Sequence, residues 1–180
     1  MPPEARHIQN LALTGFMGTG KSSVGRLLAD QLRFAFLDTD EEIERRTGKS
    51  IPAIFAHDGE AHFRDLERAL VAELATLRHT VISTGGGLGA NAENIARLKA
   101  HALVVCLWAA PDRIWERIRH QHHRPLLQDP DPLGKIRRLL KEREPVYRQA
   151  DVLLNTELRC QREVAQQILH QFHAAQPRSR

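Results

Sequence analysis

The segment that most constrains the fold is Gly15–Ser23, which reads GFMGTGKSS. It fits the pattern G-x-x-x-x-G-K-[ST], in which a glycine-rich loop between a strand and a helix surrounds phosphate groups. Glycines let the backbone approach a phosphate closely, and the loop N–H groups and the start of the helix form an anion site. The pattern predicts that Lys21 neutralises the β- and γ-phosphates and that Ser22 offers its hydroxyl to Mg²⁺.

The residues around this loop have the context that the motif requires. The stretch Ile8–Thr14 is short, apolar and extended in character, and predicts a strand. The stretch Val24–Leu32 has apolar residues at helical spacing, and we expect its helix to begin near Lys21. A glycine-rich turn that binds nothing is the alternative, and a strand before the loop with a helix after it argues against that alternative.

Length and composition favour a soluble globular protein. With 180 residues, 42% of them hydrophobic and 27% charged, the chain fits a single domain over residues 1–180. The longest apolar run, Ala102–Ala110, is too short to cross a membrane, and the first residues lack the apolar core of a signal peptide. Cys106 and Cys160 form no metal motif, so we expect a reduced, cytoplasmic protein with no membrane partner.

The charge balance is basic, with a formal net charge of +4 and an isoelectric point near 9.5. A nucleic-acid-binding protein would gather its basic residues on one face or along one helix. Here the arginines are spread along the chain and aromatic residues are few, so no stacking platform is evident. We therefore expect no nucleic-acid partner and attribute the basic side chains to anionic small-molecule substrates.

Strand-like and helix-like stretches alternate from end to end, which is typical of an α/β fold with a parallel central sheet. We expect five strands, at residues 8–14, 34–37, 81–84, 102–108 and 152–155. We expect helices at residues 21–32, 41–46, 51–55, 60–77, 91–99, 111–119, 133–148 and 162–174. The polar, proline-containing stretch 120–132 is typical of a lid, and the tail from about residue 175 to 180 is expected to fray.

Unusual side chains or glycines follow three of these strands. The first strand leads into the phosphate loop, the second into Asp38 and Asp40, and the third into Gly85–Gly87. Ligands of such a sheet bind at the carboxyl ends of its strands, so these groups are expected to converge. On an extended segment the two aspartates lean to the same side, so that one can serve the Mg²⁺ shell and the other a substrate hydroxyl. Alternatively, Asp40 is only a helix N-cap with Asp38 solvated, and the glycine triplet is a flexible joint.

Three arginines are candidates for binding anionic groups. Arg64 has Glu60 and Glu67 at positions i−4 and i+3, which would hold its guanidinium for a bidentate grip on a carboxylate or in a plain surface ion pair. Arg124 lies in the expected lid, from which it could stabilise charge on a transferred phosphoryl group. Arg143 faces either the substrate or water. The histidines of the lid, His120, His122 and His123, lack the partners of a metal site, so we expect them to be solvated.

Taken together, these motifs resemble the shikimate kinase family over most of the chain, from about Asn10 to Thr156. The segments that carry the resemblance, in order, are 15–26, 38–40, 43–44, 48–51, 54–55, 59–60, 63–64, Glu67, 83–87, 124–127 and 143–147. The phosphate loop alone is widespread, whereas this order and spacing of segments is specific. The departures, Leu88–Asn91 and the histidine-rich lid, remove no catalytic group.

The resemblance implies a five-stranded parallel sheet in the order 2-3-1-4-5, as in nucleoside monophosphate kinases. It also implies transfer of the γ-phosphoryl group of ATP to the 3-hydroxyl of shikimate, with one Mg²⁺ per subunit, in aromatic amino-acid biosynthesis. Its catalytic residues would be Lys21, Asp40 and Arg124. Its nucleotide-binding residues would be Gly18, Thr19, Gly20, Lys21, Ser22, Ser23, Arg117, Arg124 and Arg159. Its shikimate-binding residues would be Asp40, Arg64, Gly85, Gly86, Gly87 and Arg143, and its metal-binding residues Ser22 and Asp38.

Two other functions are alternatives to this one. Another small-metabolite kinase, such as a gluconate kinase, would share the phosphate loop but not the aspartate pair, the glycine triplet and both arginines. A non-catalytic nucleotide-binding relative would be expected to have lost Lys21, Asp38, Asp40 or Arg64, and all four are present. We expect the protein to be a monomer that binds only small molecules.

Overall fold

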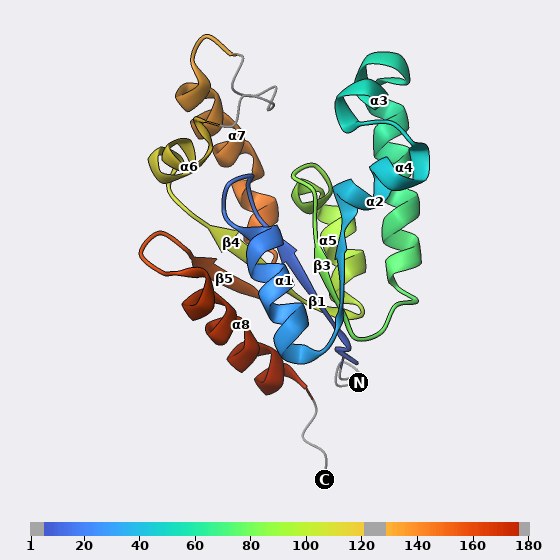
Figure 1. Cartoon of the computed structure of the whole chain (residues 1–180), viewed down its shortest axis with the longest axis vertical. Helices are drawn as coiled ribbons and strands as arrows, with labels where there is room; N and C mark the ends of the chain where they lie inside the picture. The colour runs from blue at the N-terminus through green and yellow to red at the C-terminus, as the bar shows by residue number, and fades with distance from the viewer. Residues whose placement is uncertain (1–5, 121–128, 177–180) are drawn as a thin grey trace.

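Five parallel strands in the order β2-β3-β1-β4-β5 form the central sheet of the computed structural model, which describes residues 6–120 and 129–176 (Figure 1). Both the parallel α/β fold and the strand order confirm the prediction. The strands are β1 (Asn10–Thr14), β2 (Ala35–Asp38), β3 (Thr80–Ser83), β4 (Ala102–Trp108) and β5 (Val152–Asn155). Because β1 lies between β3 and β4, the direction of winding changes at its carboxyl end, where the phosphate loop begins.

The two faces of the sheet follow from the alternation of side chains along a strand. In β1, Leu11 and Leu13 point into one core and Ala12 into the other. In β4, Val105 and Val104 divide in the same way. Both strands are apolar throughout because helices cover both faces of the sheet, which is the usual situation of a parallel sheet.

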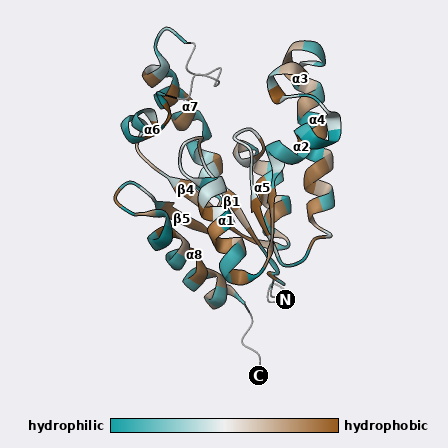
Figure 2. Cartoon of the chain, in the orientation of Figure 1, coloured by the Kyte–Doolittle hydropathy of each residue, from teal (hydrophilic) through white to brown (hydrophobic). Residues whose placement is uncertain are grey.

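The helices are α1 (Lys21–Leu32), α2 (Thr39–Thr47), α3 (Ile51–His57), α4 (Gly59–Leu74), α5 (Ala92–Lys99), α6 (Pro111–Ile118), α7 (Pro132–Tyr147) and α8 (Gln161–Ala175). Helices α1 and α8 cover one face of the sheet, and α4 and α5 cover the other. Figure 2 shows the central strands as mainly hydrophobic and the helices as two-sided. In Figure 1, α6 and α7 rise on one side of the phosphate loop, and α2, α3 and α4 rise on the other.

The fourth expected helix is shorter than predicted. Its apolar stripe continues to Leu77, which packs against the core, but α4 ends at Leu74. The chain has to turn there to enter β3, and His79 takes the left-handed conformation, with φ of 52°. A hydrophobic pattern reports which side chains face the core, and it can therefore run past the end of the helix itself.

The expected lid and tail lie largely outside the described residues. Residues 121–128 belong to the expected lid at 120–132, of which the structure describes only His120 and a short stretch before α7. Residues 177–180 of the expected tail are also outside, whereas α8 continues to Ala175. Within 6–120 and 129–176, none of the helices has the length and apolarity needed to traverse a bilayer.

Candidate active site

A cavity of about 400 Å³ lies at the carboxyl end of the sheet and contains most of the predicted site residues. It is lined by the phosphate loop, by both aspartates that follow β2 and by the start of the glycine triplet after β3. Its lining residues are Met17, Gly18, Gly20, Lys21, Ser22, Ser23, Asp38, Asp40, Ser83, Thr84, Gly85, Gly86 and Arg117. The convergence predicted from three separate strand ends is therefore present.

The phosphate loop has the backbone that its glycines permit. Gly15 has φ of 128°, and a Cβ atom there would lie 2.2 Å from the carbonyl oxygen of Leu107. Gly20 is the N-cap of α1, with φ of 96°, so the first turn of α1 starts at Lys21. The Lys21 Nζ donates to the carbonyl oxygens of Gly15 at 2.9 Å and Phe16 at 3.0 Å. The lysine is thus held across the mouth of a loop whose glycines could not be replaced without strain.

Ser22 and Asp38 lie side by side although they come from different strand ends. The Ser22 hydroxyl donates to Asp38 Oδ2 at 2.8 Å, and Ser83 Oγ lies 3.4 Å from Ser22 Oγ. Oxygen donors are what Mg²⁺ prefers, so this hydroxyl and carboxylate fit a magnesium ion chemically. Within the described ranges no group of three or more histidine, cysteine or acidic residues is arranged to hold a metal.

The two aspartates are not on an extended segment, which corrects the prediction. Strand β2 ends at Asp38, which is the N-cap of α2, and Asp38 Oδ1 accepts from the Asp40 backbone N–H at 3.1 Å. Asp40 already belongs to the first turn of the helix, so the alternative that made Asp40 the cap is also wrong. Both carboxylates nevertheless line the same cavity.

Asp40 is a half-buried carboxyl group with a strongly shifted pKa. Burial and then the charge of Asp38 raise its pKa from 3.8 to about 6, although Lys21 opposes the shift. Glu67 and Glu44 contribute smaller increases. A carboxylate with a pKa near neutrality is suited to accept a proton, and perturbed carboxyl groups of this kind are typical of functional sites.

The glycine triplet is a platform on which Asp40 and the two arginines meet. A Cβ atom at Gly85 would lie 1.9 Å from Asp40 Oδ1, and one at Gly87 would lie 1.9 Å from Arg64 Nη1. At Gly86 the nearest atom would be Arg143 Nη1, at 3.6 Å. The prediction that these glycines share a site with Asp40 and the two arginines is consistent with this geometry, and close approach rather than flexibility explains the first and third glycine.

Arg64 projects from α4 and is held by two carboxylates. Its Nη1 donates to Glu67 Oε2 at 2.7 Å, and its Nη2 donates to Glu60 Oε1 at 2.9 Å. The Glu67 side chain is 3% exposed, whereas that of Glu60 is 66% exposed. Burial raises the pKa of Glu67 and the hydrogen bond from Arg64 opposes that increase. Arg64 is therefore fixed by a buried carboxylate. An ion pair at the protein surface, the alternative left open by the sequence, would have no buried partner.

Arg143 approaches the triplet from the opposite side, on α7. Its Nη1 donates to the carbonyl oxygen of Gly86 at 3.2 Å, and its guanidinium carbon lies 5.4 Å from the centre of the Phe16 ring. In the described part of the chain it forms no ion pair. Of the two orientations left open by the sequence, the side chain takes the one that faces the site.

Two of the arginines expected to bind the nucleotide lie around a second cavity, of about 790 Å³, on the other side of the phosphate loop. Arg117 donates to the carbonyl oxygens of Gly18 at 3.3 Å and Thr156 at 2.7 Å. Arg159 donates to the carbonyl oxygen of Asn155 at 2.6 Å. Both arginines line this cavity together with Thr19, and the shared lining residues Gly18 and Gly20 join it to the first.

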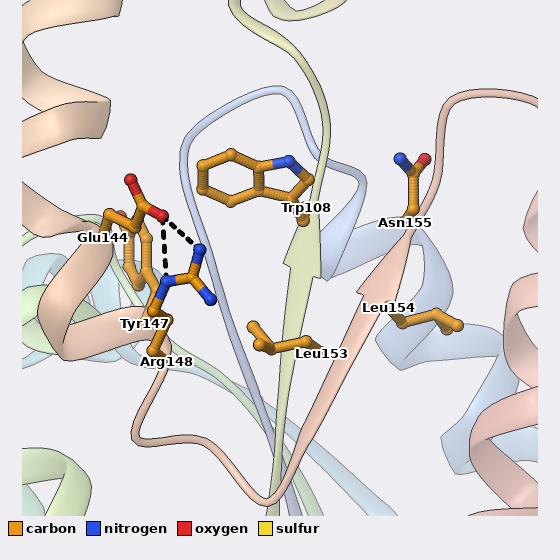
Figure 3. A pocket seen from close by; sticks show the side chains of 7 residues that line it. All are labelled: Trp108, Glu144, Tyr147, Arg148, Leu153, Leu154 and Asn155. Atoms are coloured by element: carbon orange, nitrogen blue, oxygen red, sulfur yellow. Dashed lines mark hydrogen bonds and ion pairs between the residues drawn. The ribbon is translucent and has the colours of Figure 1, made fainter.

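Arg124, His122 and His123 lie outside the described residues, and His120 is exposed at the end of α6. Cys106 is buried in β4, and burial raises the pKa of its thiol to about 12. A further hollow lies between α7 and the β4–β5 edge of the sheet (Figure 3). There Glu144 and Arg148 pair across one turn of α7, near Trp108 and Leu153.

Sequence reasoning missed two residues that organise the site. Thr39, between the two aspartates, is fully buried, and its hydroxyl accepts from the Gly85 N–H at 2.7 Å. Phe16, inside the phosphate loop, is 1% exposed and supports Arg143. The only hint of the Thr39–Gly85 contact in the sequence was the position of a threonine between two aspartates. The contact of Phe16 with Arg143 joins residues 127 positions apart and had no signal in the sequence.

Comparison with known proteins places this geometry in one family. The family model for shikimate kinase matches residues 17–173. The shikimate kinase of Thermodesulfovibrio yellowstonii is 42% identical over 165 residues, which cover 92% of this chain and 95% of the relative.

Solved structures agree with the sequence comparison. A shikimate kinase from Acinetobacter baumannii, in complex with shikimate, superposes with a TM-score of 0.87 at 40% identity, over 94% of this chain and 95% of that one. A gluconokinase from Sinorhizobium meliloti has a TM-score of 0.61 at 19% identity, over 94% of each chain, and shares only the fold. The chain belongs to the shikimate kinase family.

Proposed function

We propose that this protein transfers the γ-phosphoryl group of ATP to the 3-hydroxyl of shikimate, with the donor over the phosphate loop and the acceptor over the glycine triplet. The family phosphorylates shikimate with ATP, and the Acinetobacter baumannii relative was solved with shikimate bound. The observation that carries the proposal is the approach of Asp40, Arg64 and Arg143 to three successive glycines, two of which line the same cavity as Lys21. A carboxylate-bearing polyol needs cationic groups for its carboxylate and an acidic group for its hydroxyls, and this platform offers both.

On the donor side, the loop N–H groups and the start of α1 bind the phosphates, and Lys21 neutralises their charge. Thr19, Ser23 and Gly18 belong to the same loop, while Arg117 and Arg159 border the cavity proposed for the adenine. Arg124 would approach the phosphates from the lid. Such positioning and charge stabilisation account for most of the catalysis in phosphoryl transfer.

One Mg²⁺ per subunit would be held by Ser22 directly and by Asp38 through its water shell. When bound, the ion would neutralise charge on the β- and γ-phosphates. The hydrogen bond of 2.8 Å between the Ser22 hydroxyl and Asp38 supports this assignment, because it brings the two oxygen groups together. Asp38 also caps α2, so the residue proposed to serve the ion fixes the helix turn that carries Asp40.

On the acceptor side, Arg64 and Arg143 bind the carboxylate from opposite sides of the triplet. Asp40 orients the reacting hydroxyl and accepts its proton, for which a pKa of about 6 is well placed. Closure of the lid would exclude water and so limit hydrolysis of ATP.

The test is a coupled ADP-release assay with ATP and Mg²⁺ that compares shikimate, gluconate and no acceptor. Turnover with shikimate alone is the expected result. ADP release with gluconate alone would overturn the acceptor assignment while keeping the phosphate loop. ATP binding without turnover on either acceptor would mean that the protein is a nucleotide-binding relative without kinase activity. Chromatography coupled to light scattering tests the expected monomer separately.

A further inference from the structure

The charge of Arg143 is balanced differently from that of Arg64. Arg64 has two carboxylate partners, whereas among the described residues Arg143 has none and contacts the Gly86 carbonyl oxygen and the face of the Phe16 ring. Its other neighbour is the buried, uncharged hydroxyl of Tyr147, where Arg143 opposes the increase in pKa that burial causes. A guanidinium over an aromatic face is attracted by the ring quadrupole without being neutralised. The arrangement therefore orients Arg143 while leaving its full charge available to an incoming anion.

Phe16 is well placed to fix a guanidinium because it is itself immobilised. Its ring is 1% exposed and packs in the core cluster that includes Ile136, Leu140 and Tyr147 of α7. Its carbonyl oxygen accepts from Lys21 Nζ at 3.0 Å and from the Thr19 hydroxyl at 2.7 Å. One residue of the phosphate loop thus touches the phosphate-side lysine with its backbone and the acceptor-side arginine with its ring.

We propose that Phe16 is a positioning residue whose ring face sets the guanidinium of Arg143 for the acceptor carboxylate. This inference rests on the proposed function for the identity of the acceptor. In this role the Phe16 ring acts on the acceptor through Arg143, whereas the contacts of Phe16 with the donor side are made by its backbone. Its substitution therefore weakens binding of the acceptor and leaves the chemical step unchanged.

The decisive experiment changes the ring electronics and keeps the ring shape. Mono-, di- and trifluorinated phenylalanines are incorporated at position 16 alone. Steady-state kinetics gives the KM for shikimate, the KM for ATP and kcat, and calorimetry gives the Kd for shikimate. A cation–π contact is weakened stepwise by fluorination, so the KM and Kd for shikimate should rise in steps to about fivefold to tenfold. The KM for ATP and kcat should stay within about twofold, because the donor contacts are made by the Phe16 backbone.

The matched control is Phe36, whose ring lies 4.5 Å from the guanidinium carbon of Arg26, outside both cavities. The same fluorinated series at Phe36 should leave every kinetic constant unchanged. A double-mutant cycle gives a second test: Phe16→Leu should raise the KM for shikimate in the wild type and have no further effect in Arg143→Met.

The outcomes separate the two proposals. A wild-type enzyme that neither binds nor phosphorylates shikimate overturns the proposed function itself. If the wild-type enzyme is active on shikimate, two results overturn only the role of Phe16. One is a KM for shikimate that does not change across the fluorinated series at position 16, and the other is additive effects in the double-mutant cycle. A parallel rise in the KM for shikimate and the KM for ATP would show that the ring supports the whole phosphate loop. That result would also overturn the proposed role of Phe16.

Discussion

The two arginines that face each other across the glycine triplet are held in opposite ways. Arg64, on α4, is tied to one buried and one exposed glutamate. Arg143, on α7, rests on an aromatic face and a backbone carbonyl. Ion pairs fix a guanidinium at the expense of its net charge, whereas a ring and a carbonyl fix it and leave the charge uncompensated.

This difference shows how one site can hold one guanidinium in a fixed orientation and keep the positive charge of the other available for an anion. On the α4 side, Glu67 fixes the guanidinium of Arg64. On the α7 side, Arg143 is proposed to offer its positive charge to the carboxylate of the acceptor. Between them, Asp40 lies against Gly85 and is proposed to orient the reacting hydroxyl and to accept its proton. Substitutions on the two sides and at the centre should therefore differ in which constant they change.

The largest effect is expected for Asp40→Asn, which should lower kcat by about 10²- to 10⁴-fold with the KM for shikimate nearly unchanged. Burial and the charge of Asp38 hold the folded pKa of Asp40 at about 6, above its value in the unfolded chain. The ionised carboxylate thus destabilises the folded protein above pH 6, and the variant should have a higher Tm at pH 8. Near-normal turnover would remove Asp40 from the mechanism.

The triplet allows a sharper test within three neighbouring positions. Gly85→Ala places a Cβ atom on the Asp40 carboxylate, and displacement of a reacting group by about 1 Å is expected to cost about 100-fold in kcat/KM. Gly87→Ala displaces Arg64 and should act mainly on the KM for shikimate. Gly86→Ala meets Arg143 Nη1 only at 3.6 Å and is the matched control, expected to retain activity within a few-fold. Equal losses at all three positions would contradict the platform.

Substitution of each arginine in turn separates an effect on substrate binding from an effect on the stability of the fold. Arg143→Met should raise the KM for shikimate about tenfold to 100-fold, as expected for a charged hydrogen-bonding partner, with Tm unchanged. Arg64→Met should raise the same KM and also lower Tm by about 5 °C, because it leaves the buried Glu67 carboxylate unpaired. Steady-state kinetics and thermal denaturation of the two variants measure both. The same Tm for both variants would contradict a structural role that Arg64 has and Arg143 lacks.

The pH profile tests the centre of the site without mutation. With the pKa of Asp40 near 6, the carboxylate form is lost as pH falls, so kcat/KM should decrease about tenfold per pH unit below pH 6. Residual activity of Asp40→Asn should be flat over the same range. A wild-type profile with its acid limb near pH 4 would mean that Asp40 ionises as an ordinary carboxyl group.

The smallest effects are expected from the two glutamates behind Arg64. Glu67→Gln keeps one hydrogen bond but removes the buried charge, and should raise the KM for shikimate about fivefold. Glu60→Gln affects a partner that is 66% exposed and should change the KM by less than about twofold. If the two substitutions have the same effect, the buried glutamate does not hold the arginine more firmly than the exposed one.

Local sequence patterns predicted most of the fold, because strands, helices and glycine-rich turns depend mainly on the residues within each segment. The alternation of apolar strands and two-sided helices gave the parallel α/β class, and the P-loop pattern gave the Gly20–Lys21 helix start. Element ends were less well predicted, as at Leu74, since the end of a helix depends on where the chain must turn. The aspartate pair shows the same limit: helix α2 begins one residue after β2, which made Asp38 the cap in place of Asp40.

By itself, the sequence determined the phosphate loop and the strand ends at which ligands gather, and it identified Asp40, Arg64 and Arg143 as candidate site residues. These depend on residue type and on spacing along the chain, which a sequence contains in full. Only the tertiary structure decided that Gly85 and Gly87 lie against Asp40 and Arg64, that Glu67 is buried beneath one arginine, and that the Phe16 ring lies beneath the other. Such contacts join residues on different elements, and their distances are set by how helices pack on the sheet rather than by any local preference.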